Sequence, residues 1–148
     1  MQKLTDLQPL IIEWAKERNI HLIECAPKQR LKLIEECGEL ANAILKDNIE
    51  EQKDAVGDIF VVLTILSEQT GLDFTFNFIE GNAKEIQYLI YGLIGYSFPD
   101  WQEESPFDWL NDICLILNLD FTECANLAWN EIKYRKGKTV NGTFIKHV

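Results

Sequence analysis

Apolar residues recur with the 3.6-residue period of an α-helix along most of this 148-residue chain. Glycines, prolines and short polar clusters divide the pattern into segments of helical length. The pattern predicts six helices, at about residues 6–19, 28–46, 50–70, 82–96, 107–118 and 122–136. Alternation of apolar and polar positions never extends beyond a few residues, so no substantial sheet is expected. The predicted fold class is therefore all-α, a helical bundle of five to six helices.

The first two predicted helices each carry an apolar stripe that we expect to face the core. In the first helix the stripe comprises Leu7, Leu10, Ile11 and Trp14. Pro9 fits this helix only in its first turn, which predicts a start near Asp6. In the second helix the predicted core stripe comprises Leu31, Ile34, Gly38, Ala41 and Leu45.

Turn signals separate the later segments. Residues 46–48 (Lys-Asp-Asn) form the expected turn between the second and third helices, and Gly71 ends the third. The segment 97–106 contains two prolines and is a predicted loop. Gly137 ends the sixth helix, and Gly142 marks a turn in an extended tail.

The third predicted helix places an acid inside an apolar segment. Residues 55–66 are apolar on nearly every face except at Asp58 and Thr64, which indicates a buried helix. Burying an unpaired carboxylate is costly, so Asp58 needs a cation or a close partner. Asp54, one turn earlier, lies on the same face of the helix.

Further acids lie on the second helix, where Glu36 and Glu39 point in similar directions and Glu35 lies beside them. Because a short turn joins this helix to the third, the two should pack antiparallel and bring these acids near Asp54 and Asp58. Converging carboxylates repel one another unless a divalent cation neutralises them. Oxygen ligands without His or Cys favour Mg²⁺ or Mn²⁺ over Zn²⁺. The alternative is a solvated acidic face with ordinary ion pairs.

Composition and charge narrow the function classes. Apolar residues make up 47% and charged residues 26% of the chain, which is typical of one globular domain. A net charge of −10 argues against binding nucleic acid over a broad face. The N-terminus lacks the apolar stretch of a signal peptide, and the longest apolar run, 59–66, is too short to span a bilayer. We expect a cytoplasmic protein with neither nucleic-acid nor membrane partners.

Four cysteines without paired spacing are expected to be buried, reduced thiols: Cys25, Cys37, Cys114 and Cys124.

The C-terminal segment reverses the charge of the chain. Residues 133–148 contain five basic residues and no acid, which gives this segment a formal charge of +5. Since the whole chain carries −10, residues 1–132 carry −15. Cations at the end of a helix can simply complement its dipole. They also suit a clamp on phosphate groups. The candidates for phosphate binding are Lys133, Arg135, Lys136 and Lys138.

Two segments of the chain are weakly similar to each other. DAVGDIFVVL (54–63) is similar to DWLNDICLIL (108–117), and TGLDFT (70–75) to LNLDFT (117–122). Either two amphipathic helices are similar by chance, or residues 83–118 are a degenerate copy of the helix pair 30–66. The copy would lack the acids of the first pair, since it has Gln87, Tyr88 and Tyr91 at their places.

The run KLIEECGELANAI (32–44), followed by DAVGDIFVVLTIL (54–66), resembles the MazG-like, all-α NTP pyrophosphohydrolase superfamily. Small phage-type and Gram-positive members are the most similar. The family signature is E-E-x-x-E on one helix and E-x-x-D on the next. Its first half is matched by Glu35, Glu36 and Glu39, and its last acid by Asp58. The C-terminal NEIKYRKGKTVNGTFIK (130–146) also resembles the ends of such members.

The chain departs from the family signature at one position. The family usually has Glu three residues before the last acid, and this chain has Ala55 there. Asp54 is the nearest acid. The departure leaves open which residue supplies a fourth metal ligand.

The resemblance implies an enzyme, a metal-dependent hydrolase that converts a (deoxy)nucleoside triphosphate to monophosphate and pyrophosphate in nucleotide-pool housecleaning. Mg²⁺, or Mn²⁺ in its place, would be held by Glu36, Glu39, Asp54 and Asp58. Glu35 or Glu36 would orient or deprotonate the attacking water. The resemblance further implies a homo-oligomer, dimer or tetramer; the alternative is that the extra helices complete the bundle within one chain. The length of the chain predicts a single domain over residues 1–148, with the catalytic helix pair at about 28–70.

Two residues outside the acids and the tail are candidates for substrate contact. Lys32, one turn before Glu36, either pairs with that acid or neutralises a phosphate oxygen. Trp14 either packs in the core or, as in similar proteins that hold the base near this end of the chain, stacks on a base.

Two alternatives remain beside a general NTP pyrophosphohydrolase. One is a base-specific member that acts on dUTP, dCTP or phosphoribosyl-ATP. The other is a non-catalytic helical module that binds a metal or a partner, which Ala55 in place of an acid favours.

Overall fold

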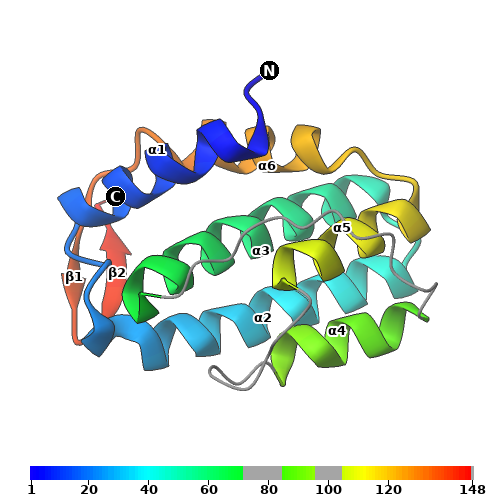
Figure 1. The fold of residues 1–148 in the computed structure, drawn as a ribbon, viewed down its shortest axis with the longest axis horizontal. Coiled ribbons are helices and arrows are strands. Elements are labelled where there is room, and N and C mark those ends of the chain that lie inside the picture. Colours follow the sequence, from blue (N-terminus) through cyan, green and yellow to red (C-terminus); the bar gives the residue numbers. More distant parts are fainter. Residues whose placement is uncertain (72–84, 96–104, 148) are drawn as a thin grey trace.

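The computed structural model describes residues 1–71, 85–95 and 105–147, and it confirms the all-α fold class (Figure 1). The helices within these residues are α1 (Leu4–Glu17), α2 (Ala26–Leu45), α3 (Ile49–Thr70), α4 (Ile86–Ile94), α5 (Pro106–Leu117) and α6 (Phe121–Ile132). A 3-10 turn, Ile23–Cys25, precedes α2, and a hairpin of β1 (Gly137–Val140) and β2 (Thr143–Lys146) follows α6. None of the described helices has the length and apolarity needed to cross a membrane.

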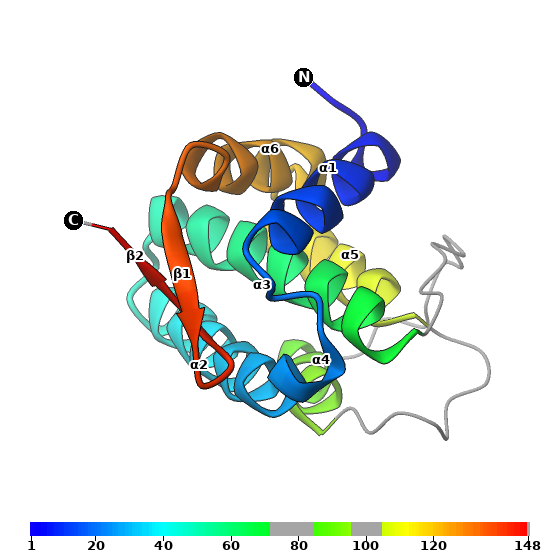
Figure 2. The same ribbon diagram turned by 90° about the vertical axis from the view of Figure 1, so that its left-hand side faces the viewer.

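Helix α3 is the centre of the bundle and contacts α1, α2, α5 and α6 (Figures 1 and 2). As predicted, nearly all of residues 55–66 are buried. Phe60 makes edge-to-face contacts with Phe107 of α5 and Phe121 of α6, at centroid distances of 5.6 and 5.7 Å. Phe60 therefore ties both later helices to α3, and the core forms around this helix. The four cysteines are free and buried, as expected.

The turn between α2 and α3 is confirmed at residues 46–48. Asp47 adopts a left-handed conformation with φ of 51°, and the Asn48 side chain accepts a hydrogen bond from the Glu51 amide at 3.2 Å. This N-cap satisfies one of the free amides at the start of α3. Gly71, with φ of 69°, ends α3 as predicted. The short turn brings α2 and α3 together as an antiparallel pair (Figure 1).

The predicted core stripe of α2 is wrong. Leu31, Ile34 and Leu45 are exposed, and Leu45 retains 85% of its accessible surface. The buried face lies on nearly the opposite side of the helix and comprises Leu33, Glu36, Cys37, Leu40 and Ala43. Helix α2 carries two apolar rows, and the row that also carries Glu36 is the one turned toward α3 and Asp58. We call the exposed residues Leu31, Ile34 and Leu45 the outer row of α2.

The ends of α1 and α6 also differ from the prediction. Helix α1 begins at Leu4, so Pro9 lies in its second turn rather than its first and removes one helical hydrogen bond there. Helix α6 ends at Ile132, four residues early. The carbonyl of Ile132 accepts a hydrogen bond from the Trp14 indole at 3.0 Å. The Arg18 guanidinium binds the carbonyl of Arg135. These contacts from α1 redirect the chain into the hairpin.

The tail forms a β-hairpin rather than a simple extended segment. β1 and β2 pair antiparallel around Asn141 and Gly142, which have φ of 49° and 78°. Positive φ at both central residues is the conformation that an Asn-Gly pair favours in a tight hairpin turn. The hairpin crosses one end of the bundle between the sides of α6 and α2 (Figure 2).

Parts of two expectations lie outside the described residues. The predicted loop 97–106 is described only at residues 105–106, and the predicted helix 82–96 only from residue 85, with α4 beginning at Ile86. Helix α4 packs against α5, as α2 packs against α3. The degenerate repeat over 83–118 stays a prediction.

Candidate functional site

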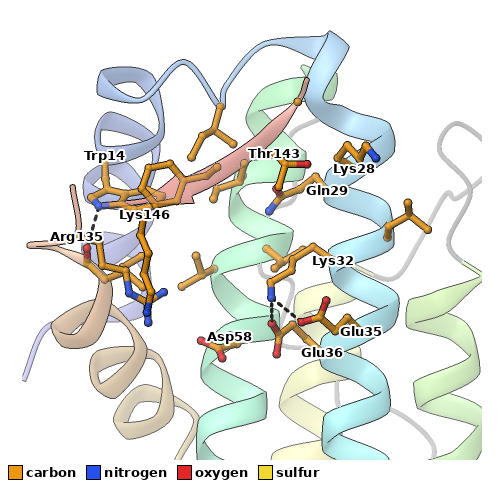
Figure 3. A pocket seen from close by; sticks show the side chains of 18 of the residues that line it. Trp14, Lys28, Gln29, Lys32, Glu35, Glu36, Asp58, Arg135, Thr143 and Lys146 are labelled. Carbon is orange, nitrogen blue, oxygen red and sulfur yellow. Dashed lines mark hydrogen bonds and ion pairs between the residues drawn. The ribbon is translucent and has the colours of Figure 1, made fainter. Parts of the chain in front are cut away.

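A pocket of about 670 Å³ opens between α2, α3 and the hairpin (Figure 3). Acidic, basic and apolar side chains line this pocket. The acids that line it are Glu35, Glu36, Glu39 and Asp58. The basic side chains that line it are Lys28, Lys32, Arg135 and Lys146. The apolar part includes Ile20, Val61, Val62, Ile65 and Phe144. One cavity therefore offers carboxylates, cations and apolar surface.

Three of the acids converge. Glu36 and Glu39 lie on one face of α2, and Asp58 extends from the facing turn of α3. Each offers a carboxylate oxygen, and these oxygens lie within 4.8 Å of one another. Glu36 is 3% exposed, Asp58 is half-buried and Glu39 is exposed to solvent. We call these three residues the acidic cluster, and it lies where the core meets the pocket.

Lys32 contacts the acidic cluster from the pocket side. Its Nζ lies 2.9 Å from Oε1 of Glu36 and 2.8 Å from Oε1 of Glu35 (Figure 3). Burial would lower the pKa of Lys32, but its hydrogen bonds to these two carboxylates outweigh burial and hold the pKa above its ordinary value. Lys32 is therefore a charged ammonium. The second oxygen of Glu36, Oε2, is buried and has no hydrogen-bond partner within the described residues.

Burial makes the charges of the cluster costly. Burial, followed by repulsion from Glu36 and Asp54, raises the pKa of Asp58 to about 7. Burial also raises the pKa of Glu36, although Lys32 opposes the shift. Such a group needs a proton or a cation. The donor set consists of carboxylate oxygens, and one of them lacks a partner, so the residues fit a hard divalent cation such as Mg²⁺ or Mn²⁺.

Asp54 is near the acidic cluster but not part of it. Its side chain is exposed, one turn before Asp58, and it does not line the pocket. Its pKa is raised by partial burial and then by repulsion from Glu131 and Glu36. Ala55 is 2% exposed and packs in the core. The role of Asp54 as a fourth ligand stays a prediction.

The structure brings only part of the predicted phosphate clamp to the pocket. Arg135 lines it and pairs with Glu131 of α6. Lys133 hydrogen-bonds Asn130 at 2.8 Å. Lys133, Lys136 and Lys138 are described, but none of them lines the pocket. In their place the cavity is lined by Lys28 and Lys146.

Trp14 packs at the edge of the pocket. It is 8% exposed, its edge meets Phe144 at a centroid distance of 5.4 Å, and the Arg18 guanidinium lies 4.4 Å from the ring centroid. With its indole N–H bound to Ile132, the ring is held on several sides. These contacts are those of core packing, and Trp14 also lines the pocket, so its stacking on a base stays a prediction.

Several pocket residues were not among the predicted site residues. They are Lys28, Gln29, Thr143, Phe144 and Lys146. Lys28 lies four residues before Lys32, so the helical period that placed Lys32 with the acids also places Lys28 on that face. The Asn141-Gly142 pair predicts a hairpin. A predicted hairpin would have made the residues of β2 candidates for the site.

Comparison with known proteins supports the resemblance found in the sequence. Residues 28–86 match the model of the MazG nucleotide pyrophosphohydrolase domain. The chain is MazG-like over this segment. The MazG-like segment contains Lys32, Glu35 and the whole acidic cluster, and it ends where α4 begins. The C-terminal hairpin lies outside it.

A phage protein is also similar to this chain. It is the "uncharacterized 18.2 kDa protein in rep-hol intergenic region" of Haemophilus phage HP1 (strain HP1c1), with 41% identity over 73 residues. The match covers 47% of this chain and 45% of the phage protein, so the chain spans less than half the length of that relative. No solved structure matches the chain.

Proposed function

We propose that the protein is a metal-dependent pyrophosphohydrolase that converts a (deoxy)nucleoside triphosphate to its monophosphate and pyrophosphate. One observation carries the proposal: in a MazG-like segment, Glu36, Glu39 and Asp58 converge at one end of a pocket that basic residues also line. The carboxylates can bind the metal ion, and the basic side chains can bind the phosphate groups of a nucleoside triphosphate. A solvated acidic face does not account for a buried Glu36 beside a half-buried Asp58.

The acidic cluster would hold the metal ion, Mg²⁺ or Mn²⁺. Such an ion polarises phosphate oxygens and neutralises the charge that develops on them. Glu35 lines the pocket beside the cluster with an exposed carboxylate, which suits it to orient a water molecule and accept its proton. The water oxygen bonds to the α-phosphorus, the bond from that phosphorus to the bridging oxygen breaks, and pyrophosphate leaves.

The remaining pocket residues would hold the rest of the substrate. Lys28, Arg135 and Lys146 are suited to the phosphates, because they bring positive charge to the same cavity as the acids. The apolar part around Val62, Ile65 and Phe144 is suited to the base and sugar.

We further propose that the protein is a homo-oligomer. The outer row of α2 supports this, because Ile34 and Leu45 leave apolar surface exposed beside Leu31, which also lines the pocket. A second copy of the chain would cover this surface.

A chromatographic assay tests the proposed reaction. The purified protein and Mg²⁺ are incubated with standard and deoxy NTPs, including dUTP and dCTP. We expect monophosphate and pyrophosphate, separated from diphosphate and phosphate, with turnover lost in Glu39→Ala. Because Glu39 is exposed, this variant should fold normally. Diphosphate and phosphate as products, or full turnover in Glu39→Ala, would contradict the proposal.

A further inference from the structure

Lys32 engages the carboxylate that a metal ion also needs. Its ammonium binds Oε1 of Glu36 at 2.9 Å and is anchored by Glu35 at 2.8 Å (Figure 3). Glu36 is nearly fully buried, and its Oε2 has no hydrogen-bond partner among the described residues. The ammonium therefore supplies positive charge at a buried carboxylate that water hardly reaches.

A divalent cation in the acidic cluster would compete with this ammonium. The cluster oxygens lie within 4.8 Å of one another, so a cation among them would lie close to Lys32 Nζ. Like charges at such a separation repel strongly where water is partly excluded. A cation bound to the Glu36 carboxylate, whose Oε2 is free of hydrogen bonds among the described residues, would also withdraw negative charge from that carboxylate and weaken its bond to Lys32. Metal binding should therefore drive the ammonium away from Glu36.

The pocket offers the displaced ammonium a new partner. The Lys32 side chain is half-exposed and lines the same cavity as Lys28, Arg135 and Lys146. A phosphate group in this cavity would replace Glu36 as the negatively charged partner of Lys32. The flexible lysine side chain allows the ammonium to move from one partner to the other.

We propose that Lys32 is an internal counter-ion, displaced from Glu36 by the metal and then taken up by a phosphate group of the substrate. This inference rests on the proposed function and states how its two ligands are coupled. Metal and phosphate bind cooperatively, because the ammonium opposes metal in the empty pocket and attracts phosphate once the metal is bound. Coupling of this kind is reciprocal, so each ligand raises the affinity for the other.

A purely structural Lys32 makes the opposite prediction. If the lysine only held Glu36 in a conformation suited to metal, its loss would weaken metal binding or leave it unchanged. If it is a displaced counter-ion, its loss strengthens the binding of metal alone.

The test is calorimetric titration of Mn²⁺ into the wild-type protein, Lys32→Met and Lys16→Met. Lys16 of α1 is half-exposed and pairs with Glu68 at 3.6 Å, so its variant loses the same charge away from the pocket. We expect Lys32→Met to bind Mn²⁺ about tenfold more tightly than wild type, and Lys16→Met within about twofold. At saturating Mn²⁺, Lys32→Met should bind an α,β-imido nucleoside triphosphate about tenfold more weakly.

The outcomes separate this proposal from the proposed function. Unchanged or weaker Mn²⁺ binding in Lys32→Met, with normal binding in wild type, overturns the role of Lys32 alone. Absence of Mn²⁺ binding in all three proteins overturns the metal site and the proposed function with it. Lys32→Gln, which also removes the charge but keeps a hydrogen-bond donor, must bind Mn²⁺ more tightly as well. Thermal unfolding in EDTA establishes that each variant is folded.

Discussion

At the scale of the single residue, Asp58 is held where burial opposes its charge. It lies in a helix segment that is otherwise almost wholly buried, and it faces the carboxylate of Glu36. Its pKa of about 7 means that the metal-free protein folds more readily when this acid is protonated. A partly buried acid without a cation or proton destabilises the folded protein, and acids in such positions are common at functional sites.

We expect Asp58→Asn to stabilise the metal-free protein in a pH-dependent manner. The folded-state pKa is raised above the ordinary 3.8, so folding takes up a proton between about pH 4 and 7. Stability of the wild-type protein therefore falls as pH rises through this range. The gain in Asp58→Asn should be about 2–4 kcal/mol at pH 8 and less than about half of that at pH 5. Urea unfolding in EDTA at both pH values measures it.

An exposed acid provides the control for this prediction. Glu13→Gln on α1 removes a charge at the surface and should change the unfolding free energy by less than about 0.5 kcal/mol at either pH. A gain in Asp58→Asn that was equal at pH 5 and pH 8 would show that the titration of Asp58 does not cause it.

At the scale of the element, close helix packing decides how α3 meets α6. A Cβ atom added at Gly57 would lie 2.3 Å from the Cys124 carbonyl oxygen and 2.9 Å from the Ala128 Cβ. The backbones of the two helices can approach this closely because Gly57 has no side chain. Asp58 is the next residue, so this contact also fixes the part of α3 that carries it.

Two glycine substitutions should therefore have opposite effects. Gly57→Ala should destabilise the protein by about 2 kcal/mol or more, because neither α3 nor α6 can shift without disturbing the core. Gly38→Ala on α2 should stabilise it by about 0.5–1 kcal/mol, because a Cβ there meets nothing within 4 Å and alanine favours helix. Urea midpoints followed by circular dichroism compare them. Equal effects of the same sign would contradict the packing account.

Element boundaries could be predicted where their causes are local. The turn at residues 46–48 and the end of α3 at Gly71 follow from side chains within the turn itself. The end of α6 could not be predicted, because it depends on Trp14 and Arg18, more than a hundred residues away. The buried face of α2 was missed because the helix has two apolar rows, and only contact with α3 selects between them.

At the scale of the whole molecule, the acidic end of the pocket followed from the sequence better than the basic end. Spacing on α2 and a short turn to α3 were sufficient to predict that Glu36, Glu39 and Asp58 converge. The phosphate side depends on where the hairpin docks, which no local pattern specifies. Lys146 therefore lines the pocket, whereas Lys138 on the paired strand does not.

The outer row of α2 is the surface at which we expect two copies of the chain to associate. If a second copy covers it, Ile34→Glu should place a charge within that contact and shift the protein toward monomer. Ile34 is 46% exposed in the single chain, so the variant should keep its fold and its thermal unfolding of the monomer. Light scattering during size-exclusion chromatography measures the mass. Leu127→Glu, at a similarly exposed position on α6, should leave the mass unchanged. A monomeric wild-type protein would show that the row serves no self-association, whereas a mass lowered by Ile34→Glu alone would place the contact on the helix that carries Glu36 and Glu39.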